Sequence, residues 1–165
     1  MAEADIFQSE RGQNRGHFYV DAAIDMVFPL FGAEAEARWA PGWRAEWIYP
    51  SHEQAQTSSP ERGWVFKTDG GTPEERIWYV EAFSEAAHEA VYLVLWPDKM
   101  VVRIEVKSRP QPGGTFTTVE YDFRGLSAEG NRLIKKRTAN PNDFTMEMNQ
   151  WAEQISSYLR KAKRK

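Results

Sequence analysis

The chain has 165 residues, of which 41% are hydrophobic and 13% aromatic, and its 21 Lys and Arg against 24 Asp and Glu give a net charge of −3. This size and composition fit one folded domain with a real core and exclude a disordered chain. Cysteine is absent, which excludes disulfides and thiolate sites, and no apolar run reaches the ~18 residues of a membrane span, so we expect a cytoplasmic protein without membrane insertion.

The first part of the chain combines two strands with short helical segments. Residues 1–15 are polar, and we predict a flexible leader there. Residues 17–20 predict a strand, after which two short helices are expected over 21–31 and 34–39, with Pro29 interrupting the first. Residues 47–49 resemble a strand, and a polar loop is expected from 51 to 62.

Five further segments of strand character follow, separated by turn-forming residues. Their short connections predict an antiparallel meander, and their alternation gives it one apolar face. The third of them is apolar on both sides, which predicts an additional cover over Tyr92, Val94 and Trp96; a partner subunit would supply it, so a homodimer is allowed. The five segments span residues 64–68, 76–83, 90–96, 101–107 and 115–123.

A long helix closes the chain over residues 143–163. Its length of about 30 Å is enough to cross a small domain. Residues 132–137 before it read as a solvated basic connector, and residues 161–165 as a basic tail. Exposed stacking aromatics do not interleave with residues 132–137, and the cations of the tail complement the C-terminal end of the helix dipole, so we expect no nucleic-acid binding. The apolar stripe of the helix consists of Phe144, Met148, Trp151, Ile155, Tyr158 and Leu159.

Together these elements predict an α+β fold, in which a curved antiparallel sheet of about seven strands grips the C-terminal helix. With that element order in place, the sequence Trp39-Ala40-Pro41-Gly42-Trp43 becomes informative. The chain resembles the START-like SRPBCC superfamily, which holds birch-pollen-allergen-like proteins, lipid-transfer domains and polyketide cyclases/dehydrases, and within it a bacterial family of unassigned function. The resemblance implies a single START-like domain over residues 16–160 with a mostly apolar cavity between sheet and helix.

Several aromatic side chains are candidates for the walls of such a cavity, although the same spacing also fits plain core. Tyr121 is the best polar candidate, because a buried phenol needs a partner that a ligand would supply. Arg76, Glu81 and Arg103 also lie on strands, and the alternation directs Arg103 to solvent. The candidate cavity residues are Trp39, Trp43, Trp64, Phe66, Trp78, Tyr121 and Trp151.

Motifs for other chemistry are missing from the sequence. The three histidines are far apart, so we expect no metal site, and no glycine-rich phosphate loop occurs, so we expect no nucleotide and no cofactor. The leading hypothesis is the binding of a small hydrophobic or aromatic molecule for transport, sequestration or sensing. One alternative is a polyketide cyclase/dehydrase-like enzyme with unknown catalytic residues; another is a protein-interaction module.

Overall fold

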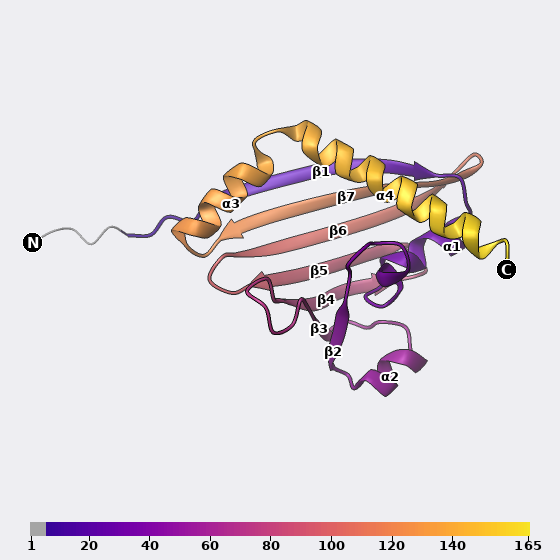
Figure 1. The fold of residues 1–165 in the computed structure, drawn as a ribbon, viewed down its shortest axis with the longest axis horizontal. Helices are drawn as coiled ribbons and strands as arrows, with labels where there is room; N and C mark the ends of the chain where they lie inside the picture. Colours follow the sequence, from indigo (N-terminus) through magenta and orange to yellow (C-terminus); the bar gives the residue numbers. More distant parts are fainter. Residues whose placement is uncertain (1–5) are drawn as a thin grey trace, which may run out of the picture.

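The computed structural model describes residues 6–165, so the first five residues of the predicted leader lie outside the described range. Within these residues the chain forms seven strands, five shorter helical segments and one long closing helix (Figure 1). In chain order the elements are β1 (Arg11–Val20), α1 (Ile24–Val27), the 3-10 helices η1 (Phe28–Phe31) and η2 (Ala35–Arg38), β2 (Ala45–Tyr49), α2 (His52–Thr57), β3 (Val65–Thr68), β4 (Arg76–Ser84), β5 (Glu89–Trp96), β6 (Met100–Gln111), β7 (Gly114–Gly125), α3 (Ala128–Thr138) and α4 (Pro141–Ala162).

The strands form one antiparallel sheet in the order β1-β7-β6-β5-β4-β3-β2. Strands β2 to β7 pair with their neighbours in sequence, as the short connections predict, and β1 pairs with β7 over its full length. The α4 helix lies across the sheet, and the predicted α+β fold with its sheet-and-helix grip is confirmed (Figure 1).

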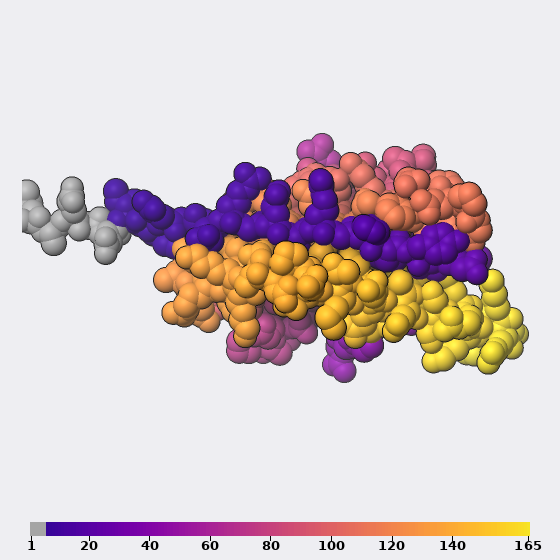
Figure 2. Space-filling view, turned by 90° about the horizontal axis from the view of Figure 1, so that it is seen from above, coloured from indigo at the N-terminus to yellow at the C-terminus, as the bar shows by residue number. Residues whose placement is uncertain are grey.

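Two glycines of β1 let α3 and α4 lie close to the strand. A Cβ atom on Gly16 would stand 2.8 Å from Met148 Cγ, and one on Gly12 would stand 2.6 Å from a methyl carbon of Ile134. Met148 and Ile134 are fully buried at these contacts. Figure 2 shows the two helices running along β1 for most of the long axis.

Three local predictions are corrected by the structure. The sheet extends into the segment taken as a leader: β1 begins at Arg11, and the Gly125 amide donates to the Glu10 carbonyl at 2.9 Å. Residues 132–137 belong to helix α3, which Ser127 caps by accepting from the Gly130 amide at 3.0 Å. The expected loop over 51–62 contains the short helix α2.

Strand β5 is the middle strand of the sheet, and its inward side chains Tyr92 and Val94 are covered within the chain. Tyr92 and Val94 face the interior and are buried by this chain alone, since the Tyr92 hydroxyl donates to the Phe31 carbonyl of η1 at 2.7 Å. The cover predicted from a partner subunit is therefore supplied by the chain's own helical segments.

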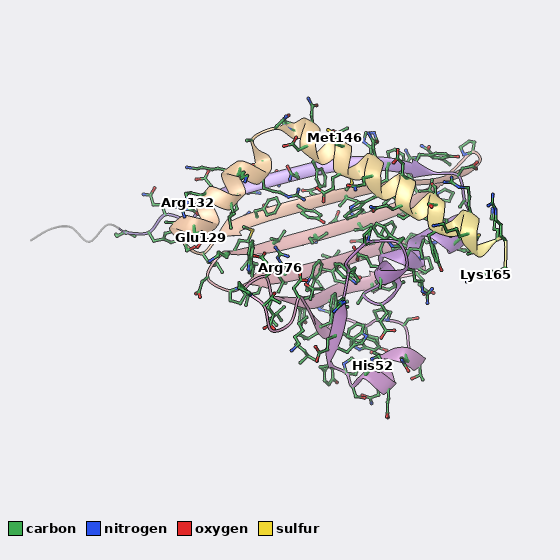
Figure 3. The ribbon with its side chains drawn as sticks, in the orientation of Figure 1. His52, Arg76, Glu129, Arg132, Met146 and Lys165 are labelled. Atoms are coloured by element: carbon green, nitrogen blue, oxygen red, sulfur yellow. The ribbon has the colours of Figure 1, made fainter. Side chains whose placement is uncertain are left out.

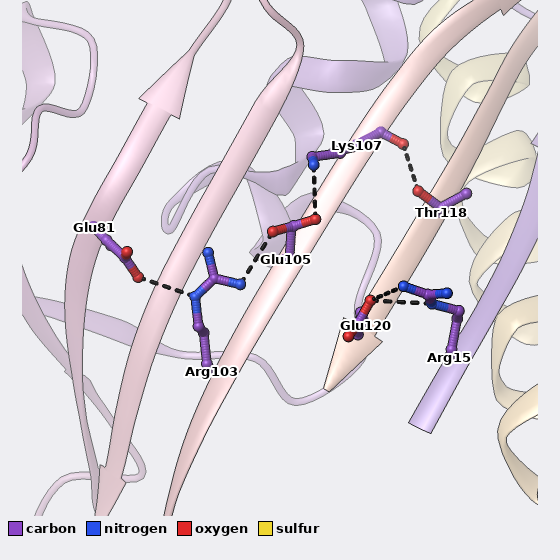
Figure 4. Close-up of polar contacts among 7 residues, drawn as sticks. All are labelled: Arg15, Glu81, Arg103, Glu105, Lys107, Thr118 and Glu120. Carbon is purple, nitrogen blue, oxygen red and sulfur yellow. Dashed lines mark hydrogen bonds and ion pairs between the residues drawn. The ribbon is translucent and has the colours of Figure 1, made fainter. Parts of the chain in front are cut away.

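The outer face of the sheet carries a network of ion pairs (Figure 4). Arg103 contacts Glu81 at 3.3 Å and Glu105 at 3.0 Å, and Lys107 contacts the other oxygen of Glu105 at 2.9 Å. Burial alone would raise the pKa of Glu105, but the hydrogen bonds from Lys107 and Arg103 lower it. Glu81 and Arg103 thus lie on the face opposite the interior, as the alternation predicts for Arg103.

Candidate ligand-binding cavity

A cavity of about 690 Å³ lies between the inner face of the sheet and helices α3 and α4. Volumes of this size are typical of small-molecule sites. Its walls are mostly apolar, and four of the seven predicted aromatic residues line it: Trp43, Trp78, Tyr121 and Trp151. The other lining residues are Glu36, Arg76, Val94, Trp96, Met100, Val102, Ile104, Phe123, Leu133, Lys136, Arg137 and Asp143.

The other three predicted aromatic residues form the core behind these walls. Phe66 is 1% exposed and stacks on Trp78, with ring centroids 5.4 Å apart. Trp39 packs edge-on against Trp151, with ring centroids 5.4 Å apart. Trp64 packs edge-on against Trp47 of β2. Phe66 and Trp39 thus pack behind lining rings, and none of the three residues borders the cavity.

Three tryptophans spaced four residues apart hold the segment that enters the cavity wall. The indole N–H groups of Trp39, Trp43 and Trp47 donate to residues 30–34 at 2.8, 2.6 and 2.9 Å. Two acceptors are backbone carbonyls and the third is a carboxylate. These bonds connect residues after η2 to residues before it, so they hold the backbone of η2 in position.

Glu36 of η2 places a carboxyl group in the cavity wall. Its backbone is fixed on both sides, since its amide donates to the Gly32 carbonyl at 3.0 Å and its carbonyl accepts from the Ala40 amide at 2.8 Å. The side chain is half-buried and lines the cavity. Within residues 6–165 the carboxyl has no ion pair and no hydrogen-bond partner, and burial raises its pKa to about 8.

Two tyrosines lie close enough to Glu36 for its charge to affect their pKa. Burial raises the pKa of both Tyr92 and Tyr121, and the Glu36 charge raises each further. The Tyr92 hydroxyl is already used by the Phe31 carbonyl. The Tyr121 hydroxyl and the Trp151 indole N–H have no hydrogen-bond partner in the described part of the chain. Both residues line the cavity.

The arginines of the cavity wall have carboxylate partners. Arg76, labelled in Figure 3, lies on the sheet face that α3 and α4 cover. Its guanidinium lies 3.6 Å from the Glu74 carboxylate and 4.3 Å from the centroid of the Trp96 ring, over which it stacks. Arg137 contacts Glu147 at 2.7 Å. Each of the two arginines in the wall is therefore paired with a carboxylate.

Exposed charges mark the rim. Lys136 and Asp143 line the cavity yet are exposed to solvent, so the cavity meets the outside between α3 and the start of α4. An outer groove beside Ala40 shares Arg137, Asp143 and Trp151 with the cavity, which places the opening at the same end.

Sequence reasoning missed Glu36, Lys136, Arg137 and Asp143. Glu36 lies in a run of alternating alanine and acidic residues, a composition that favours a solvated helix face. The one indication was its place three residues before the Trp39-to-Trp43 motif.

No family model and no curated protein sequence matches this chain. Solved structures do match. Norcoclaurine synthase from Thalictrum flavum, in complex with dopamine and hydroxybenzaldehyde, superposes with a TM-score of 0.62 at 10% identity, over 93% of this chain and 88% of that one. Ara h 8.0201 superposes with a TM-score of 0.64 at 16% identity, over 92% of this chain and 99% of that one. A protein from Thermobifida fusca superposes with a TM-score of 0.62 at 21% identity, over 88% of this chain and 94% of that one.

The chain has the helix-grip fold. These neighbours show that the sequence resemblance to START-like, birch-pollen-allergen-like proteins holds at the level of fold. The helix-grip fold serves both binding and catalysis, so function has to be argued from the cavity. Within residues 6–165 no three His, Asp or Glu side chains gather to hold a metal ion, and no helix has the length and apolarity that crossing a bilayer requires.

Proposed function

We propose that this protein binds a small, mainly aromatic or hydrophobic molecule in the cavity between the sheet and helices α3 and α4. The observation that carries the proposal is the cavity itself, about 690 Å³ bordered by Trp43, Trp78, Tyr121 and Trp151. Aromatic walls offer a large area to a flat ligand and favour offset or edge-on ring contacts.

Filling the cavity should abolish binding without unfolding the protein. Val102 of β6 is 8% exposed and lines the cavity, so Val102→Trp should place an indole in the space that the ligand needs. The neutral fluorescent probe N-phenyl-1-naphthylamine should bind the wild type, with a blue-shifted and brighter emission, and bind the variant at least about tenfold more weakly.

Val101 provides the matched control, because the side chains of neighbouring strand residues point to opposite faces. Val101→Trp adds the same ring on the outer face of β6 and should leave probe binding unchanged. Equal binding to the wild type and to Val102→Trp, with both folded by circular dichroism, would contradict the cavity as the binding site.

A second function is favoured by Glu36 alone. A carboxyl whose pKa is raised to about 8 inside a cavity is suited to proton transfer, since efficient acid–base groups have pKa values near the working pH. The chain would then be an enzyme acting on an aromatic or polyketide-type substrate, with Glu36 as the proton-transfer group.

This second function is tested by isotope exchange. At pH 9, where most of the Glu36 carboxyl is ionised, the wild type should accelerate the exchange of the acidic C–H hydrogens of 2-tetralone in D₂O by about 10²-fold or more over Glu36→Gln. Proton NMR follows the exchange directly. Equal rates for the two proteins would argue for binding without catalysis.

A further inference from the structure

The charges that border the cavity do not balance. Arg76 and Arg137 already have carboxylate partners in Glu74 and Glu147, and Lys136 and Asp143 are exposed to solvent at the rim. Glu36 is the charged group of the described wall that is half-buried and has no partner within residues 6–165.

A half-buried carboxyl without a protein partner is costly to ionise in a mainly apolar cavity. Burial opposes ionisation, so the empty cavity holds the neutral acid, and a cation or a strong hydrogen-bond donor would restore the carboxylate. The groups around it suit such a guest, since the faces of indole and phenol rings attract cations. Trp43, Trp78, Tyr121 and Trp151 border the same space.

Given the ligand-binding function proposed above, we infer that the ligand is an aromatic amine-bearing molecule, whose protonated nitrogen pairs with the Glu36 carboxylate while its ring system lies among the cavity indoles. The Tyr121 hydroxyl and the Trp151 indole N–H stay free for a further polar group of the ligand. An anionic ligand is disfavoured, because it cannot draw Glu36 into an ion pair and the two wall arginines already have carboxylate partners.

Three probes that share a naphthalene ring test this assignment by displacement of N-phenyl-1-naphthylamine at pH 7: 2-(2-naphthyl)ethylamine, 2-(2-naphthyl)ethanol and 2-naphthylacetate. The wild type should prefer the amine over the alcohol by about tenfold or more, because an ionic hydrogen bond replaces a neutral one. The acetate should bind most weakly. Glu36→Gln should keep the alcohol affinity and lose the preference for the amine.

Two further measurements separate this role from a merely structural one. Asp143→Asn, which removes the rim carboxylate, should retain the amine preference. Calorimetry in two buffers of different ionisation enthalpy should show the release of about one proton when the amine binds the wild type at pH 7, and none in Glu36→Gln. Comparing the two proteins cancels the contribution of the other titratable groups near Glu36. These are Arg76, Tyr121, Lys136, Arg137 and Asp143 of the cavity wall, and Tyr92 behind it.

The outcomes distinguish the two levels of the proposal. If the alcohol binds but Glu36→Gln leaves the amine preference intact, or if Asp143→Asn removes it, the Glu36 pairing is wrong and the cavity function stands. If none of the naphthalene probes displaces N-phenyl-1-naphthylamine, or that dye itself does not bind, the binding function fails and the amine assignment fails with it.

Discussion

Glu36→Gln should make the protein more stable at neutral and alkaline pH, by up to about 3 kcal/mol at pH 7. The unfolded chain loses the Glu36 proton near the ordinary pKa of 4.5, whereas the folded protein holds it until about pH 8. Between these values the folded state binds more protons than the unfolded state, so the stability of the wild type falls as pH rises. Below pH 4.5 both states are protonated and the effect disappears.

Urea denaturation at pH 4.5, 7 and 9 measures this difference. The free energies of unfolding of wild type and Glu36→Gln should agree at pH 4.5, separate by pH 7 and run parallel above about pH 8. Glu53→Gln, which changes an exposed side chain of α2, should follow the wild-type profile. Parallel profiles across the whole range would mean that the Glu36 carboxyl is solvated, and would also weaken the inferred pairing with an amine.

Met148→Ala should lower the free energy of unfolding by about 2–5 kcal/mol, the range for a buried methionine. Met148 is fully buried in α4, where it packs above Gly16 of β1, so its loss leaves a void that neither element can close.

Trp151→Ala, one helix turn away, should cost only about 1–2 kcal/mol although the side chain is larger, because one side of the indole borders the cavity. Its remaining contacts are edge-on, with Trp39 at 5.4 Å and Phe18 at 6.3 Å. Chemical denaturation of both variants gives the comparison. A loss from Trp151→Ala as large as that from Met148→Ala would identify the ring as core and the cavity as filled in solution.

The long helix and the meander could be predicted because their residues obey simple periods. The stripe from Phe144 to Leu159 repeats at helical spacing, and α4 spans Pro141–Ala162 against the predicted 143–163. Helix α3 was missed because its surface is rich in Lys and Arg and its apolar contribution is small: Ile134 is its one fully buried large side chain. A basic segment with so few apolar residues looks like a connector until the sheet beneath it is known.

The candidate site was only half predictable, for a similar reason. Large aromatic residues at strand or helix spacing indicate an interior position, so Trp43, Trp78, Tyr121 and Trp151 could be predicted as candidates for the cavity wall. The spacing does not say whether a ring borders empty space or another ring. Trp64 and Phe66 have the same alternation and are core. Glu36 was missed because its burial follows from the position of η2 against the sheet, which local sequence does not encode.

The pairing of tryptophans gives this protein an optical property of its own. Six of its seven indoles form three edge-to-face couples, Trp39 with Trp151, Trp43 with Trp78 and Trp47 with Trp64, at centroid distances of 5.4, 5.3 and 5.2 Å. Transition dipoles held at such distances couple, so the intense far-ultraviolet band of the paired indoles should split into a dichroic couplet. Because two couples each have a member on the cavity wall, a guest that tilts one ring changes the spectrum, and the molecule reports its own occupancy without a label.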